Sequence, residues 1–294
     1  MKRVLSTVVA FVFLACMALG LASCGDASTR KDISQATSIA DLEGAIIASQ
    51  SGTFHETARK QIKNVQGSVY SDFSSMLIAL RSGAIDGYIA EEPTALTVCG
   101  KDSTLDYLHL KNNENGFSAT EEDTAIAIGC KKGSSLIPEI NRVLATISEK
   151  TRKELMEQIA RVSAGETIDT FVLSNAAPKN PTGKLRVAME CAYEPFNWTQ
   201  KTDANGAVKI SSAGSAGLYA NGYDVQIAKY VANALNLELE IYAESWSSLV
   251  AGVMSGTYDA IIAGMSPTAD RKESIDFTDV YYRSNLVIIY RKSF

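Results

Sequence analysis

The residues best suited to binding a small anion lie between positions 259 and 283. An apolar run at 260–263 predicts a buried strand, and it ends on Gly264, where a ligand can approach the backbone closely. Ser266 and Arg271 follow, the latter in a helical turn. Free backbone N–H groups at the start of a helix and a guanidinium together suit a carboxylate. A plain strand, loop and helix with a surface arginine would account for these residues equally well.

The longer pattern favours the binding site. It resembles a signature of the polar-amino-acid solute-binding proteins of ABC importers, in which a small-residue strand end is followed by a hydroxyl residue, an arginine and Asp-Phe-Ser/Thr-x-x-Tyr. In this chain the matching residues are Gly264, Ser266, Arg271, Asp276-Phe277-Thr278 and Tyr281-Tyr282. The resemblance is to extracellular solute-binding family 3 and implies a type II periplasmic-binding-protein fold. That fold is α/β, with two lobes that each contain a mainly parallel sheet.

The two halves of the resemblance occur in reverse order. Ordinary members of the family begin with a segment similar to residues 184–196 and reach the Asp-Leu-x-Gly and Ser-Gly-Thr pattern of residues 41–53 only after the arginine motif. The resemblance therefore implies a circularly permuted chain, with residues 163–183 joining the family's usual termini. The chain ends of a domain lie at its surface and often close together, so such a connection is physically reasonable.

The permuted order divides the chain into four segments. They are a signal peptide at 1–23, a tether at 24–37, a small ligand-binding lobe at 38–123 and a large ligand-binding lobe at 124–294. We expect one crossing of the chain between the lobes, at 124–129, and a monomer. The alternative is a fusion remnant whose lobes pair between two chains, since exchange of identical elements is a low-cost route to dimers.

Composition and local pattern agree with an ordinary α/β protein. Of the 294 residues 46% are hydrophobic and 21% are charged, and the net charge of −5 argues against nucleic acid as a partner. Short apolar runs alternate with amphipathic segments, which predicts helices on a mainly parallel sheet. Residues 200–219 are rich in Gly, Ser and Ala and predict a loop or hairpin. Glu91-Glu92-Pro93, taken alone, is typical of a solvated turn.

The N-terminus predicts secretion and a lipid anchor. Lys2-Arg3 precedes an apolar run at 4–21, which ends in Leu-Ala-Ser and Cys24. This ending resembles the bacterial lipobox, which implies that Cys24 carries lipid and holds an extracytoplasmic protein on the cell membrane. An uncleaved signal anchor is the alternative.

The cysteine and histidine residues give little sign of disulfides or of a metal site. Cys99, Cys130 and Cys191 would remain after processing, and an odd number argues against a disulfide framework, although one bridge is conceivable. We favour free thiols. The two histidines, His55 and His109, and the absence of a Cys-x-x-Cys pair give no sign of a metal site, and no cofactor is expected.

The family's ligand lies between the lobes, and the resemblance assigns its two backbone charges. Arg271 would take the α-carboxylate, helped by Ser266 and Thr53. Gly264, Ser266 and Glu91 would take the α-ammonium, with Glu91 one methylene longer than the aspartate often found there.

The remaining implied contacts concern the ligand's side chain. Tyr193 and Trp246 match two aromatic positions that sandwich it, Glu190 matches a position where cation-binding members carry an acid, and Gln50 lies on the same rim. A carboxylate between aromatic faces favours a guanidinium or an ammonium group. We therefore expect arginine or lysine, with histidine or glutamine as alternatives.

The resemblance implies a binding protein and not an enzyme. The lobes would close on the ligand, and the closed form would be recognised by the permease of an ABC importer. Two alternatives remain open. Cyclohexadienyl dehydratases resemble these proteins and act on a prephenate-like substrate, with Glu190 or Glu91 available for proton transfer. A lipoprotein that senses an amino acid without feeding a transporter is the other.

Overall fold

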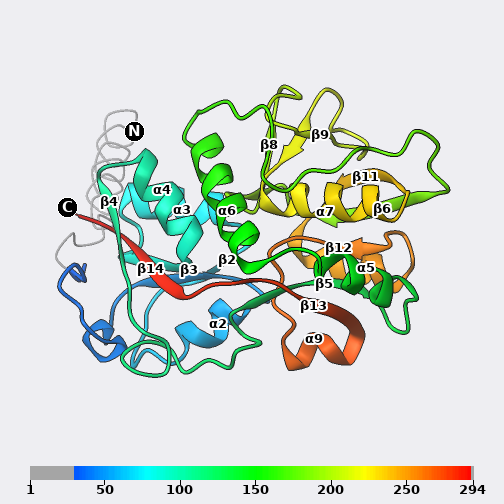
Figure 1. Ribbon diagram of the computed structural model, residues 1–294. Helices are drawn as coiled ribbons and strands as arrows, with labels where there is room; N and C mark the ends of the chain where they lie inside the picture. Colours follow the sequence, from blue (N-terminus) through cyan, green and yellow to red (C-terminus); the bar gives the residue numbers. More distant parts are fainter. Residues whose placement is uncertain (1–29, 293–294) are drawn as a thin grey trace, which may run out of the picture. The chain divides into compact units, whose positions relative to one another are not determined.

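Two five-stranded sheets organise residues 30–292, the part of the chain that this computed structural model describes (Figure 1). The chain from Asp32 onward forms a single unit by its contacts, and this unit contains both sheets. The signal peptide and the lipidation site at Cys24 lie outside the described residues. None of the helices within 30–292 is both long enough and apolar enough to cross a membrane.

The first sheet and its helices form what we call the small lobe. Its strand order is β2-β1-β3-β14-β4. The strands are β1 (Ile47–Gln50), β2 (Val69–Tyr70), β3 (Gly87–Glu91), β4 (Leu105–Leu108) and β14 (Leu286–Arg291). The helices are η2 (Ile39–Leu42), α2 (Phe54–Arg59), α3 (Phe73–Ser82) and α4 (Glu92–Lys101).

The second sheet and its helices form the large lobe. Its strand order is β11-β6-β12-β5-β13. The strands are β5 (Ala125–Lys131), β6 (Lys184–Met189), β11 (Glu238–Ala243), β12 (Ala260–Ile261) and β13 (Ile275–Arg283). The helices are α5 (Leu136–Leu144), α6 (Glu149–Ser163), α7 (Tyr223–Ala234), η3 (Trp246–Ser248), α8 (Leu249–Met254) and α9 (Ala269–Ser274).

Each sheet contains one strand that runs against the other four. In the small lobe it is β14, which pairs antiparallel with β3 and β4. In the large lobe it is β5, which pairs antiparallel with β12 and β13. The fold is therefore α/β with a mainly parallel sheet in each lobe, as the sequence predicts. Each reversed strand is the one that the chain enters after it leaves the other sheet, as the red β14 and the green β5 show (Figure 1).

The chain crosses between the lobes twice. The first crossing leads from β4 to β5, and the second leads from β13 through Ser284 and Asn285 to β14. They lie side by side, because Arg283 pairs with Ala125 and the Ser284 N–H donates to the Thr124 carbonyl at 3.2 Å. The sequence predicts only the first crossing. The second arises because β14 belongs to the small-lobe sheet, so a boundary at residue 124 does not separate the two sheets.

Continuous buried runs explain why β3 and β14 lie in the middle of their sheet. All five residues of β3 are buried, as are 286–290 of β14, and a strand covered on both faces needs such a continuous run. The core beneath includes Leu42, Ile89 and Ile288, each at most 1% exposed. Ile33 packs into this cluster, beside Gly87 of β3.

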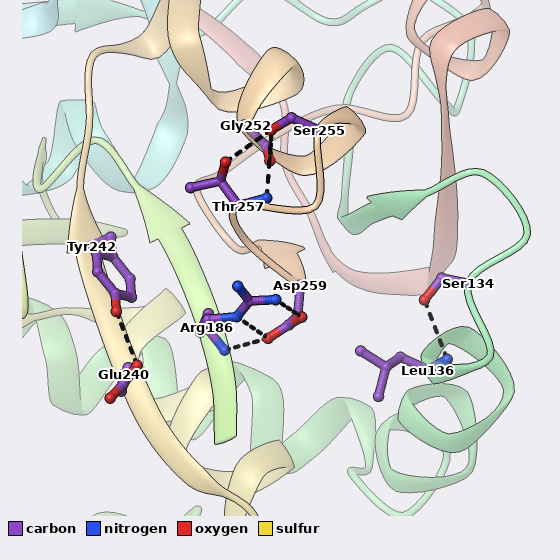
Figure 2. A network of polar contacts seen from close by, with 9 residues as sticks. All are labelled: Ser134, Leu136, Arg186, Glu240, Tyr242, Gly252, Ser255, Thr257 and Asp259. Atoms are coloured by element: carbon purple, nitrogen blue, oxygen red, sulfur yellow. Dashed lines mark hydrogen bonds and ion pairs between the residues drawn. The ribbon is translucent and has the colours of Figure 1, made fainter. Parts of the chain in front are cut away.

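An ion pair fixes the start of β12 against β6 (Figure 2). The Asp259 carboxylate accepts from Arg186 Nη2 at 2.7 Å, from Nε at 3.0 Å and from the Arg186 backbone N–H at 2.9 Å. Three hydrogen bonds to one carboxylate hold the strand in register. The strand therefore delivers its carboxyl end, where Gly264 and Ser266 lie, to a defined place.

One local expectation needs correction. Glu92 and Pro93 begin α4 and do not form a solvated turn, since proline suits the first turn of a helix. The hairpin expected within residues 200–219 is present, because β9 and β10 pair antiparallel in a small sheet of the order β7-β8-β10-β9. Its strands are β7 (Ala192–Tyr193), β8 (Asn197–Gln200), β9 (Val208–Lys209) and β10 (Tyr219–Asn221).

The connection from α6 to β6 contains no helix or strand, and it is packed along the large lobe. Phe171 and Leu173 are buried, and the Thr182 N–H donates to the Asn236 carbonyl at 2.9 Å. The side chain of Asn175 donates to the Tyr230 carbonyl at 3.0 Å. This segment is therefore an anchored strap and not a free tether.

We predict that Gly222→Ala destabilises the protein by about 3 kcal/mol. Gly222 precedes α7 at φ 130°, and a Cβ there would overlap the carbonyl of Phe196. The matched control is Gly100→Ala in α4, where a Cβ meets nothing within 4 Å and alanine should be neutral or slightly stabilising. Chemical denaturation measures both, and equal stability of the two variants would contradict the prediction.

Candidate functional site

A small cavity is lined by residues of both lobes. The small lobe contributes Gln50, Thr53, Phe54, His55, Phe73 and Glu91, and the large lobe contributes Tyr193, Trp246, Gly264, Ser266 and Arg271. The space open to the centre of a water molecule is ≈ 10 Å³, which is about what a single water needs. An amino acid therefore enters only if the lobes first separate.

Arg271 connects the two sides of this cavity. Its Nη1 donates to the Ser266 carbonyl at 2.8 Å in the large lobe, and its Nη2 donates to the Gly52 carbonyl at 2.7 Å in the small lobe. The guanidinium carbon lies 5.2 Å from the centre of the Trp246 ring, which adds a cation–π contact.

The guanidinium of Arg271 lacks an acidic partner. Within residues 30–292 no carboxylate oxygen lies within 4.0 Å of it. Burial lowers its pKa to about 10, while the charges of Asp270 and Glu91 oppose that shift. At neutral pH it remains a cation, and the two carbonyls it contacts do not neutralise its charge. An anionic ligand would do so.

Glu190 follows the last residue of β6, and it is a largely buried carboxylate where Arg271 is a largely buried cation. Gln50 Nε2 donates to both of its oxygens, at 3.1 Å and 3.2 Å, and also to the Ser71 carbonyl at 3.1 Å. Burial raises the pKa of Glu190 to about 7; the Gln50 hydrogen bond lowers it and the charge of Asp72 raises it further. No basic side chain within 30–292 lies within 4.0 Å of this carboxylate. A cation placed there would stabilise its charged form.

Glu91 lies at the tip of β3 and is only 6% exposed. Its Oε1 is 2.9 Å from Nε2 of His55, which is also buried. Its Oε2 has no hydrogen-bond partner among the described residues. The sequence singles out Glu91 but not His55, because a lone histidine near the start of a helical pattern gives no sign of a partner on a distant strand.

The two predicted aromatic residues each pack against another residue of the cavity wall. Tyr193 stacks on Phe73 of α3, with ring centres 4.1 Å apart and planes 10° from parallel. Trp246 packs against Arg271. Tyr193 and Trp246 both line the cavity, but Phe73 covers one face of Tyr193. The pattern of apolar residues in α3 marks Phe73 as core, and only the approach of the two lobes turns that position into cavity wall.

A buried network lies behind the cavity and positions Gly264. The fully buried Asp224 accepts from the Tyr281 hydroxyl at 2.6 Å and from Asn197 Nδ2 at 2.8 Å, and it also receives the Gly264 N–H. Burial raises the pKa of Asp224 to about 7, although these hydrogen bonds oppose the shift. The sequence predicts no role in the site for Asp224, which lies in the first turn of α7.

The structure brings all nine predicted ligand-binding residues to one place. Eight of them line the cavity: Gln50, Thr53, Glu91, Tyr193, Trp246, Gly264, Ser266 and Arg271. Glu190 is the ninth, and it accepts a hydrogen bond from Gln50. The hydroxyl of Thr53 donates to the Gln50 carbonyl at 2.8 Å and thereby closes the turn before α2.

Two other side-chain findings complete the description. Cys99, Cys130 and Cys191 are free thiols. Among residues 30–292 no group of three or more His, Cys, Asp or Glu side chains could hold a metal ion.

Sequence comparison identifies one part of the chain. Residues 185–294 match the model of bacterial extracellular solute-binding proteins, family 3. The match covers the C-terminal part of the chain. The matched residues begin at β6 and include Glu190, Tyr193, Trp246 and Arg271, so the large-lobe wall of the cavity lies within the matched segment. The resemblance predicted from the arginine motif is confirmed.

Several of the relatives found are amino-acid-binding proteins by name. The chain is 29% identical over 119 residues to the arginine-binding extracellular protein ArtP of Bacillus subtilis, which covers 40% of each chain. It is 31% identical over 118 residues to a probable histidine-binding protein of Neisseria gonorrhoeae, covering 40% of this chain and 38% of that one. The Escherichia coli ABC transporter arginine-binding protein 1 is 31% identical over 109 residues, 37% of this chain and 39% of that one. The chain thus spans about 40% of the length of these relatives.

Two solved structures are similar to parts of this chain. The arginine-bound form of domain 1 from TmArgBP is 25% identical, with coverage of 37% of this chain and 81% of that one and a TM-score of 0.28. A ligand-binding component of an ABC-type import system from Staphylococcus aureus is 10% identical, with coverage of 84% and 66% and a TM-score of 0.43.

The pKa of Glu190 predicts a pH-dependent stability. The pKa of Glu190 is about 7 in the folded state and 4.5 ordinarily. Between pH 4.5 and pH 7 the folded state therefore keeps a proton that the unfolded state has lost. Stability should therefore fall as pH rises from about 4.5 to 7. Glu190→Gln should remove this part of the dependence, as measured by denaturation at several pH values.

The matched control is Glu154→Gln, which changes an exposed helix carboxylate paired with Lys150. It should leave the pH profile as it is in the unchanged protein. If the profiles of the unchanged protein and of Glu190→Gln run parallel, the raised pKa of Glu190 is wrong.

Proposed function

We propose that this protein is an extracytoplasmic receptor that captures a cationic L-amino acid, arginine or lysine, between its two lobes and delivers it to an ABC importer. One observation carries the proposal: among the described residues, the same cavity region has a cation without an anion, Arg271, and a carboxylate without a cation, Glu190. An amino acid with a basic side chain supplies both missing charges. Two of the relatives are arginine-binding proteins by name, which supports such a ligand.

The ligand's contacts follow from the positions of these groups. The α-carboxylate replaces one of the two carbonyls on Arg271 and receives N–H groups near Ser266 and Thr53. The α-ammonium meets Oε2 of Glu91 and the backbone oxygens near Gly264. The side chain extends toward Gln50 and Glu190, where displacing the amide of Gln50 gives the guanidinium or ammonium its carboxylate.

Closure of the lobes is the proposed signal. The polar contacts that join the lobes include the Arg271 bond to Gly52, the Gln50 bonds to Glu190 and the salt bridge of Lys101 with Glu194 at 2.6 Å. Only two adjacent crossings of the chain connect the sheets covalently, which suits a hinge. A ligand that binds both walls favours the closed state, and a permease would recognise that state.

The order of the chain is part of the same proposal. Strands from 47–131 and strands from 184–291 are interleaved in both sheets, and the family match begins at β6, in the second half of the chain. A circular permutation accounts for this arrangement, with the strap at 164–183 joining the family's usual ends. We also propose a monomer held on the membrane by lipid on Cys24. Both sheets are completed within one chain, which supports the monomer.

Titration calorimetry of the purified protein with arginine, lysine, histidine, glutamine and prephenate tests the function. We expect saturable binding of arginine or lysine by a monomer, as judged by light scattering. Arg271→Ala should weaken every amino acid at least about 100-fold, because it removes a charged pair of hydrogen bonds. Glu190→Gln should weaken cationic ligands about tenfold and change glutamine less than about twofold.

Arg142→Ala is the matched control, since that arginine is exposed and pairs only with its helix neighbour Glu139 among the described residues. It should leave all affinities unchanged. Equal losses for cationic and neutral ligands in Glu190→Gln would contradict its role. Binding or turnover of prephenate without binding of any amino acid would replace the receptor with a dehydratase-like enzyme.

A further inference from the structure

The pair formed by His55 and Glu91 stands where the proposed function needs an acceptor for the ligand's α-ammonium. His55 is the second residue of α2, and Glu91 ends β3, so the pair joins two elements of the small lobe. The atoms Nε2 and Oε1 are 2.9 Å apart, and the two side chains are 6% and 8% exposed. Both line the cavity.

Each member of the pair has one buried polar atom without a partner among the described residues. These atoms are Nδ1 of His55 and Oε2 of Glu91. A buried carboxylate oxygen without a donor is costly, so Oε2 is available to a ligand's N–H group. A buried Nδ1 without an acceptor fits a neutral imidazole that donates through Nε2, because a proton on Nδ1 would find no partner.

The charges around the pair allow one cation on Glu91. Arg271 is near enough for its charge to interact with that of Glu91, and so is Asp224. On the far side, the ring of Phe73 meets His55 edge-on at 5.8 Å and carries no charge. On the same helix, Glu56 is paired with Lys60 at 2.9 Å, and Arg59 donates to the Gly67 carbonyl at 3.2 Å.

We propose that His55 is a built-in competitor for the ligand's α-ammonium. Neutral His55 holds Glu91 by Oε1 and leaves Oε2 for the ammonium. Protonated His55 neutralises Glu91 itself and adds a positive charge beside the place that the ammonium must occupy. Acidification therefore releases the ligand through this pair. The inference rests on the proposed function, and it assigns a positioning and pH-sensing role to a residue outside the predicted site.

A second group near the site also responds to pH. Burial raises the pKa of Glu190 to about 7, and Glu190 favours a cationic ligand when it is charged. A comparison of two ligands that both carry a guanidinium removes its contribution. The suitable pair is arginine and 5-guanidinopentanoate, which is arginine without its α-amino group.

The experiment is calorimetric titration of both compounds at pH 7.5 and pH 5.5 into the full protein and into His55→Gln. Glutamine keeps a donor for Glu91 but never carries charge. In the unchanged protein the preference for arginine over the analogue should fall about tenfold on acidification, within the limit of tenfold per pH unit for one competing proton. In His55→Gln the preference should stay within about twofold.

A preference that changes equally in the two proteins, or that does not change in the unchanged protein, overturns the proposal. Binding of arginine at pH 7.5 establishes the proposed function separately. If arginine does not bind at either pH, the receptor function fails and this inference fails with it.

A measurement on the unchanged protein keeps the test valid if His55→Gln does not fold. At pH 6, titrations in two buffers of different ionisation enthalpy count the protons released on binding. Arginine should release more protons than 5-guanidinopentanoate, because only arginine displaces the proton from His55. Equal release by the two compounds overturns the proposal.

Discussion

The site depends on the electrostatics of one largely buried guanidinium. Arg271 reaches from the large lobe to the carbonyl of Gly52 in the small lobe, and its charge has no carboxylate beside it among the described residues. Burying such a charge is costly, so the surrounding structure must hold it in place. Arg271 is held by the Ser266 carbonyl, by the face of Trp246 and by the turn before α2, which Thr53 closes. The same features that hold Arg271 leave it ready to exchange a carbonyl for a carboxylate.

Two adjacent crossings of the chain allow that exchange. Each delivers one antiparallel strand into the opposite sheet, and the hydrogen bond between Ser284 and Thr124 keeps the crossings together. The cavity walls therefore belong to separate sheets, and a small rotation at the crossings changes the distance between them. The cavity admits about one water, so opening is required before an amino acid binds. Polar contacts across the cleft, such as Gln50 with Glu190, can be exchanged for ligand contacts one by one.

The sequence predicts the elements that have a clear local pattern. The apolar run at 260–263 contains the strand β12, and the predicted site residues converge because they lie on strand ends and helix starts. What the sequence does not show are the contacts made only when the lobes meet. Phe73 looks like core until β7 is brought against it, and His55 looks like an isolated helix residue until β3 lies beside it.

Two strands show where a local pattern is not enough. The sequence places β14 in the wrong lobe, since an apolar run carries no information about which sheet it joins. The strand β13 is the other, since its pairing with β5 contains register shifts that a local pattern does not show.

The most direct test of the central claim is a crystal structure of the protein grown with arginine. We expect one arginine between the lobes, with its α-carboxylate on Arg271, its α-ammonium on Glu91 and its guanidinium at Glu190 and Gln50. All of these contacts should come from a single chain. An arginine bound elsewhere, or bound in the cavity with its carboxylate away from Arg271, would contradict it. Lobes that pair between two chains in that crystal and in solution would contradict the permuted monomer.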